Sequence, residues 1–282
     1  MSHAVEIIAG SRFEFGKNWL RFLSVLNEDR IVEAEKSLQN AFEVKNLDGK
    51  SFLDIGSGSG LFSLAARRLG ARVHSFDYDP TSVACARELK KRYFSNDPAW
   101  TIEEGSILDN HYIKSLGKFD VVYSWGVLHH TGNMWNALEN VLPLIVENGK
   151  LFVSIYNDQG KKSVLWRRVK KIYCSGLLGR CLAVGLFVPF FCLRGLFFDI
   201  LKIQNPTKRY VKYRYNRGMS LKHDWIDWLG GYPFEVAKPE EVFGFFRKRG
   251  FVMEQLKTCG GGLGCNEYVF YCNDDPERSA NK

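Results

Sequence analysis

The sequence predicts an α/β fold with a doubly wound, mostly parallel sheet, and two observations support this. Short apolar strand patterns alternate with helical patterns between residues 51 and 156, which implies a parallel sheet with helices on both faces. A glycine-rich turn, Gly56 to Gly60, separates the first strand pattern from the first helix pattern. Such a turn lets a ligand approach bare backbone and the positive end of a helix.

The strand and helix patterns can be assigned in order along the 282 residues. We expect strands at 51–55, 72–76, 100–104, 119–124, 149–156, 251–257 and 266–272. We expect helices near 60–69, 80–94, 133–146 and 239–250, the last because Pro239 lies in its first turn and Gly250 follows its end.

The remaining segments divide the chain into regions. We expect a helical cap at 1–50, a ligand-binding core at 51–160, a basic and apolar helical insert at 161–235, a C-terminal part of the core at 236–273, and a tail at 274–282. The helices of residues 1–50 either only pack on the core or also cover its binding cleft, and we favour the cover.

The residues around the glycine turn separate two classes of enzyme. The pattern Gly56-Ser57-Gly58-Ser59-Gly60 is G-x-G-x-G, whereas dinucleotide-binding folds use G-x-G-x-x-G, whose extra spacing leaves room for a pyrophosphate. Asp54, just before the turn, would repel a pyrophosphate and suits an ammonium group. Asp77 ends the second strand, where a carboxylate can bind two ribose hydroxyls. A dinucleotide-dependent oxidoreductase is therefore the less favoured reading.

This motif resembles the cofactor site of class I S-adenosylmethionine (SAM) methyltransferases. The strand at 119–124, the Leu-His-His loop that ends at His130, and the strand ending at Asn157 follow in the order typical of that family. Over residues 10–272 the chain looks most similar to ubiquinone-pathway O-methyltransferases and related small-molecule methyltransferases. The resemblance implies a Rossmann-like seven-stranded sheet whose last strand is antiparallel, with SAM as cofactor and S-adenosylhomocysteine (SAH) as product.

The cofactor residues implied by the resemblance gather at the carboxyl ends of the strands. They are Asp54, Gly56, Ser57, Gly58, Gly60, Asp77, Tyr78, Ser106, Ile107, Ser124 and Trp125. Ser106 stands where the family often has an adenine-binding Asp, so the adenine contact departs from the family pattern.

Methyl transfer from a sulfonium is an in-line displacement, which needs alignment of the acceptor and, for a phenol or enol, a general base. Candidate catalytic residues are His130, Tyr156, His223 and Asp224, and candidate acceptor-binding residues are Trp19, Asn157, Phe187 and Phe190. His130 has a loop-packing role as its alternative, and His223 with Asp224 either form an oriented base or begin a helix. No spacing of ligand-type residues demands a metal.

The insert concentrates the positive charge of the chain. The net charge is +8, and between Lys161 and Lys222 there are 15 basic residues and one acidic residue, so the rest is net acidic. Within it, Cys181 to Leu193 is an uncharged run of 13 residues that contains Pro189. Because a membrane span needs roughly 20 apolar residues, we expect no crossing. The run is either a buried lid helix or an interfacial anchor on an anionic lipid surface.

These features favour an enzyme that O-methylates a hydrophobic or lipid-linked small molecule, with phenols and quinols first and fatty or polyketide-like acids second. An acid held on an acidic carrier protein would also suit the basic insert. Nucleic acid is a less favoured partner, because the apolar core of the insert argues against it. The alternatives are an RNA-modifying methyltransferase and a binding module that uses SAM only to set its conformation.

Seven cysteines without a C-x-x-C pair, and no signal peptide at Met1 to Gly10, predict reduced thiols in a cytoplasmic protein, peripheral at the inner face of a membrane if the insert binds lipid.

Overall fold

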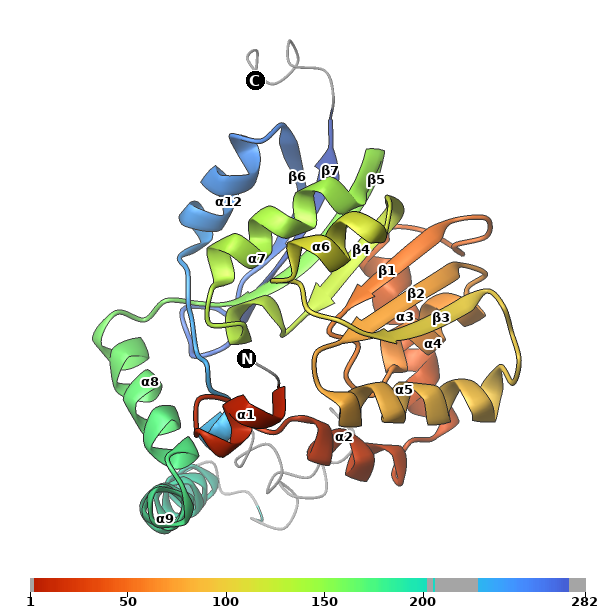
Figure 1. Cartoon of the computed structure of the whole chain (residues 1–282). Helices are drawn as coiled ribbons and strands as arrows, with labels where there is room; N and C mark the ends of the chain where they lie inside the picture. Colours follow the sequence, from red (N-terminus) through yellow and green to blue (C-terminus); the bar gives the residue numbers. More distant parts are fainter. Residues whose placement is uncertain (1–2, 202–204, 206–227, 274–282) are drawn as a thin grey trace.

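The computed structural model describes residues 3–201, 205 and 228–273 (Figure 1). Strands from this part of the chain form one seven-stranded sheet in the order β3-β2-β1-β4-β5-β7-β6. β7 runs antiparallel to both of its neighbours, and the other pairs are parallel. The predicted Rossmann-like fold with an antiparallel last strand is confirmed.

Most strand boundaries agree with the prediction to within one residue. The strands are β1 (Ser51–Ile55), β2 (Arg72–Asp77), β3 (Trp100–Glu104), β4 (Phe119–Trp125), β5 (Ile145–Tyr156), β6 (Phe251–Lys257) and β7 (Cys265–Cys272). The exception is β5, which begins before the predicted 149 because the preceding helix, expected to reach 146, ends at Val141. Pro143 lies in the short 3-10 turn that follows this helix, since proline cannot continue an α-helix.

The helices of the core lie where the alternating pattern places them, with one addition. They are α1 (His3–Ile8), α2 (Gly16–Leu23), α3 (Glu28–Phe42), α4 (Leu61–Arg68), α5 (Pro80–Tyr93), α6 (Asn110–Ser115), α7 (Met134–Val141), α8 (Lys161–Cys174), α9 (Leu177–Leu201) and α12 (Pro239–Arg247). α6 was not predicted, because six residues are too few to show a helical period. Asp109 starts it by accepting from the backbone N–H groups of His111 and Tyr112.

Two apolar layers cover the two faces of the sheet. On one face α3, α4 and α5 bury Leu38, Phe52 and Trp100, and on the other α6, α7 and α12 bury Leu151 and Phe246. Both layers fix the strands in register, so the carboxyl ends of β1, β2, β4 and β5 reach one rim of the sheet.

The N-terminal helices and the insert lie beside that rim. In Figure 1, α1 and α2 (red) and α8 and α9 (green) lie beyond the carboxyl ends of the strands. A small apolar cluster joins the two regions, because Phe13 packs with Val169 and Tyr173 of α8, Ala183 of α9 and Leu229. The cap and the insert therefore form one cover next to the sheet.

The apolar insert forms a longer helix than the uncharged run suggested. α9 is 25 residues long, and it contains an 18-residue window with a mean hydropathy of 2.1, of which only 11% is buried. Arg180, Arg194 and Pro189 all lie inside it. The expectation that the segment is too short to cross a membrane was therefore wrong on length, because the flanking arginines do not end the helix. One helix of this length and composition is by itself weak evidence for a membrane span.

We predict that Phe246→Ala lowers the free energy of unfolding by about 3–5 kcal/mol, because it leaves a cavity in the α12 side of the core. The Phe246 ring is fully buried against Phe251 and Phe270. Urea denaturation measures the change. Phe243→Ala, a partly exposed position on the same helix, is the control and should cost clearly less. Equal losses would contradict the assigned core.

Candidate cofactor and acceptor site

The glycine turn is held by backbone hydrogen bonds and has no room for side chains. The amides of Gly56 and Ser57 both donate to the carbonyl of Phe76 at the end of β2, over 2.8 and 3.1 Å. Gly56, Gly58 and Gly60 have φ of 73°, 54° and 81°, a region that strongly favours glycine. A Cβ on Gly56 would lie 2.4 Å from Val127 of the loop after β4. The turn is therefore fitted between two strand ends.

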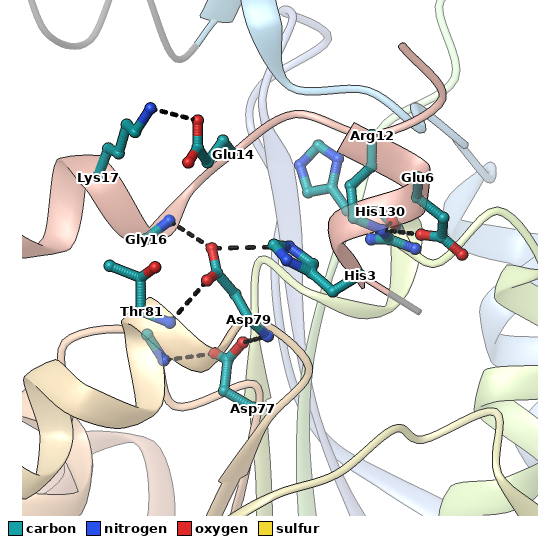
Figure 2. A network of polar contacts seen from close by, with 11 residues as sticks. His3, Glu6, Arg12, Glu14, Gly16, Lys17, Asp77, Asp79, Thr81 and His130 are labelled. Carbon is teal, nitrogen blue, oxygen red and sulfur yellow. Dashed lines mark hydrogen bonds and ion pairs between the residues drawn. The ribbon is translucent and has the colours of Figure 1, made fainter. Parts of the chain in front are cut away.

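Asp77 lies directly against this turn. One carboxylate oxygen accepts from the amide of Gly58 over 2.9 Å, and the other accepts from the amide of Asp79 over 2.8 Å; Figure 2 shows both contacts. Burial raises the pKa of Asp77 to about 6, and the two backbone donors and Arg12 oppose that rise. The carboxylate thus lies against the glycine turn, and its contact with ribose hydroxyls stays a prediction.

The N-terminal cap contacts the same edge through Asp79. The Asp79 carboxylate accepts from the amide of Gly16 over 2.7 Å and from that of Thr81 over 2.8 Å. Nε2 of His3 lies 3.7 Å from the same carboxylate (Figure 2). Trp19 lies over the glycine turn, where a Cβ on Gly58 would be 2.9 Å from its indole. The structure thus places Trp19, predicted to bind the acceptor, beside the cofactor residues.

The cap also reaches the histidine loop. The Arg12 guanidinium donates to the backbone carbonyl of His130 over 3.0 Å and lies 5.0 Å from the centre of the Tyr78 ring. Tyr78 is thereby positioned next to Asp77 and under the cap. One arginine connects the cofactor side of the rim with the side of β4.

Asp54 is buried beneath the turn. Its carboxylate accepts from the Ser63 hydroxyl of α4 over 2.5 Å. Burial is the main cause that raises the pKa of Asp54 to about 7; the nearby Asp77 carboxylate contributes to the rise, and the hydrogen bonds from Ser63 oppose it. The Ser57 hydroxyl is also buried, and it has no hydrogen-bond partner within the described residues. The turn thus lies beside the buried Asp54 carboxylate and the half-buried Asp77 carboxylate, and its Ser57 hydroxyl is left unpaired by the described residues.

The predicted adenine residues have local structural roles. The Ser106 hydroxyl accepts from the amide of Leu108 over 3.2 Å. The Ile107 side chain is buried in the apolar core. The backbone carbonyl of Ile107 accepts from the side-chain amide of Asn140 over 2.8 Å. These contacts fix the loop after β3 beside the carboxyl end of β2.

Ser124 and Trp125 end β4 and point in different directions. The buried Ser124 hydroxyl donates to the carbonyl of Ile55 over 3.2 Å, which ties β4 to the start of the glycine turn. Trp125 is 43% exposed, and its indole donates to Glu267 of β7 over 3.3 Å. Ser124 therefore lies within the site, whereas the Trp125 indole is engaged with the neighbouring β7.

Two neutral histidines follow β4. Nδ1 of His130 lies 2.6 Å from the carbonyl of Pro233, and Nδ1 of His129 lies 3.2 Å from that of Ser154. A carbonyl only accepts, so in the neutral rings Nδ1 carries the proton and Nε2 the lone pair. Burial lowers the pKa of His130 to about 3 and that of His129 well below its ordinary value. His129 was not among the predicted site residues.

Aromatic rings surround these histidines. The Tyr156 ring centre lies 4.2 Å from that of His129 and 5.5 Å from that of His130. It also lies 5.0 Å from the Phe234 ring centre and 5.9 Å from the Trp228 ring centre. Tyr156, Trp228 and Phe234 together with the two histidines form the aromatic cluster. Trp228 and Phe234 come from the C-terminal end of the insert, so no local pattern linked them to β5.

A lysine of the insert contacts the aromatic cluster. Lys170 of α8 is fully buried, and its ammonium lies 4.5 Å from the Trp228 ring centre and 5.0 Å from that of Phe234. It also donates to the Trp228 carbonyl. Sequence reasoning missed Lys170, because a lysine in a basic helix looks like a solvated one. Its place shows that α8 carries positive charge inward as well as outward.

The other predicted acceptor and catalytic residues are spread out. The Asn157 side chain accepts from Asn266 over 3.1 Å, Phe187 packs against Trp166 with ring centres 5.3 Å apart, and Phe190 is 53% exposed. His223 and Asp224 lie outside the described residues. No group of three or more potential metal ligands occurs within the described ranges.

Comparisons with known proteins agree with this geometry. Residues 53–151 match a family model described as a methyltransferase domain. The ubiquinone biosynthesis O-methyltransferase of Glaesserella parasuis is 31% identical over 123 residues, 44% of this chain and 52% of that protein. The mitochondrial one of Schizosaccharomyces pombe is 29% identical over 165 residues, 54% and 56% of the two chains. The chain thus spans about half the length of the curated relatives it matches.

Solved structures share the fold at low identity. The magnesium protoporphyrin IX methyltransferase of Synechocystis PCC 6803, solved with bound SAH, superposes with a TM-score of 0.51 and 15% identity over 86% of this chain and 82% of that one. The match over residues 53–151 and the shared fold identify a methyltransferase domain in this chain. Among methyltransferases, the sequence relatives are O-methyltransferases.

We predict that Asp77→Ala weakens SAH binding by about 10- to 100-fold, because a carboxylate that accepts charge-assisted hydrogen bonds is lost. Isothermal titration calorimetry measures the affinity. Asp120→Ala is a matched control, since Asp120 accepts from the Ser51 amide and hydroxyl over 2.9 and 2.6 Å at the opposite end of the sheet. The control should lose stability but keep its affinity. Unchanged binding by Asp77→Ala would contradict the cofactor site.

Proposed function

We propose that this protein transfers the methyl group of SAM to an oxygen of a hydrophobic or lipid-linked small molecule. The observation that carries the proposal is the aromatic cluster, which lies between the histidine loop after β4 and the apolar insert. Flat apolar rings can stack on such a surface. The sequence relatives are ubiquinone biosynthesis O-methyltransferases, which supports oxygen as the methylated atom.

The cofactor would be held by the residues around the glycine turn. Asp77 would accept from the ribose hydroxyls, Asp54 would attract the ammonium, and the unpaired Ser57 hydroxyl would gain a polar partner. Bound SAM supplies an electrophilic methyl group on a sulfonium. The two buried carboxylates fit this cation, since an opposite charge nearby favours their ionised form.

His130 would orient the acceptor hydroxyl. With Nδ1–H donating to Pro233, Nε2 is free of its proton and can accept a hydrogen bond. The low pKa of His130, about 3, keeps the ring neutral at physiological pH but makes it a weak base. Such a base suits an acidic hydroxyl, as in a phenol or quinol, better than an aliphatic alcohol. Fatty or polyketide-like acids, which need no base, are the second acceptor class.

The insert would bring the enzyme to its substrate at an anionic membrane surface. α9 exposes the side chains of Leu178, Leu182, Leu186 and Leu193. The adjoining helix α8 carries basic residues. Apolar side chains next to positive charge suit the boundary of anionic lipids. An acidic carrier protein is the alternative partner for the same basic surface.

Methyl transfer from radiolabelled SAM into a cell extract tests the reaction. The extract is divided into lipid, small-molecule, RNA and protein fractions. We expect counts in the organic phase, and Asp77→Ala should remove them. Counts in RNA that disappear with nuclease would contradict the proposed acceptor and favour an RNA-modifying enzyme, whose binding should depend steeply on salt.

Vesicle sedimentation tests the membrane proposal. Vesicles with anionic lipid should bind the protein, and replacing Leu182, Leu186 and Leu193 together with Ser should weaken this by about tenfold or more, since three apolar side chains lose burial. Phe187 and Phe191 are less suitable, because both pack against Trp166.

The control for this experiment replaces exposed leucines distant from α9 in the sequence. Leu256 and Leu263 lie on β6 and in the loop after it and are each 40% exposed. Their double Ser variant should bind vesicles as the wild type does. If the wild type binds neither neutral nor anionic vesicles, the membrane proposal is wrong.

A further inference from the structure

A chain of four buried polar groups lies beneath the glycine turn. Trp100 Nε1 donates to Ser75 Oγ over 2.8 Å, Ser75 Oγ donates to Ser63 Oγ over 2.8 Å, and Ser63 Oγ donates to Asp54 over 2.5 Å. None of the four residues is more than 3% exposed. The chain connects β3, β2, α4 and β1 and ends at the carboxylate that precedes the turn.

The indole sets the direction of every bond in this chain. An indole N–H donates and cannot accept, so Ser75 accepts from Trp100 and turns its own hydroxyl hydrogen toward Ser63. Ser63 in turn directs its hydrogen to Asp54. Since each hydroxyl has a single hydrogen, Asp54 receives a hydrogen bond and is not asked to give one. A bond of this polarity favours the ionised carboxylate.

Other forces on Asp54 act in the opposite direction. Burial and the Asp77 carboxylate of β2 raise its pKa, and the Ser63 hydroxyl and backbone amide lower it. The Tyr123 phenol of β4 also faces Asp54, and its own pKa is raised by burial and by that carboxylate. The neighbouring titratable groups are acids, so they do not stabilise a negative charge on Asp54. The hydrogen bonds that run from Trp100 through Ser75 and Ser63 do stabilise it.

We propose that Ser63, Ser75 and Trp100 are positioning residues that hold the Asp54 carboxylate in its charged form for the ammonium group of the cofactor. The inference rests on the proposed function, because it takes the methionine end of SAM as the ligand of Asp54. The positive ligand and the serine chain then act on the same carboxylate from two sides, in place of bulk water.

Titration of SAH binding against pH tests this inference. Calorimetry from pH 5.5 to 8.5 should show that wild-type affinity is lost as the pH falls through the pKa of Asp54 in the free protein, because the protonated acid no longer attracts the ammonium. Ser63→Ala raises that pKa, so its loss of affinity should begin at a pH higher by roughly one unit. At pH 7 the variant should bind about fivefold more weakly, and the difference should approach tenfold as the pH falls below 6.

Two further variants make the test specific. Trp100→Phe removes the donor at the far end of the chain, so the pH profile should move in the same direction by a smaller amount, even if Ser63→Ala fails to fold. Ser82→Ala changes a buried serine of α5 that lies outside the chain, and it should reproduce the wild-type profile. Circular dichroism confirms folding of each variant.

The outcomes separate this inference from the proposed function. If the wild type binds SAH and the folded Ser63→Ala and Trp100→Phe variants keep its pH profile, the positioning role is overturned and the cofactor assignment stands. If the wild type binds no SAH across the pH range, the proposed function is overturned and this inference with it.

Discussion

Two carboxylates at the end of β2 hold the site together. Asp77 accepts from the amide of the glycine turn, and Asp79 accepts from the first turn of α5 and from the N-terminal cap. Both residues are largely buried, so each amide they satisfy would otherwise be costly. Three segments distant in sequence thereby meet at one point. Loss of the Asp79 carboxylate would release the cap, and loss of the Asp77 carboxylate would release the glycine turn.

The two halves of the rim differ in charge. The glycine-turn half has buried acids whose pKa values are raised, and the acceptor half has neutral histidines, aromatic rings and the buried Lys170 ammonium. A cation is therefore favoured in the first half. A flat, polarisable or acidic molecule is favoured in the second. This division suits the proposed reaction between the SAM sulfonium and an acidic hydroxyl.

The core of the fold was readable from sequence because its signals are local. Strand alternation placed six of the seven strands to within one residue, and Gly58 and Asp77 lie together as expected. The acceptor half was less readable, because Lys170, Trp228 and His129 meet only through tertiary packing. The length of α9 was misjudged, since Arg180 and Arg194 looked like boundaries. An arginine does not have to end an apolar helix, because its long side chain can carry the charge out to solvent while the backbone stays helical.

The position of Trp19 over Gly58 has a kinetic consequence. In the proposed reaction SAM enters and SAH leaves beside a glycine turn that α2 covers. Exchange of one for the other then requires α2 to undock, which breaks the bond between Gly16 and Asp79. The rate of that opening sets an upper limit on turnover, whatever the speed of the chemical step.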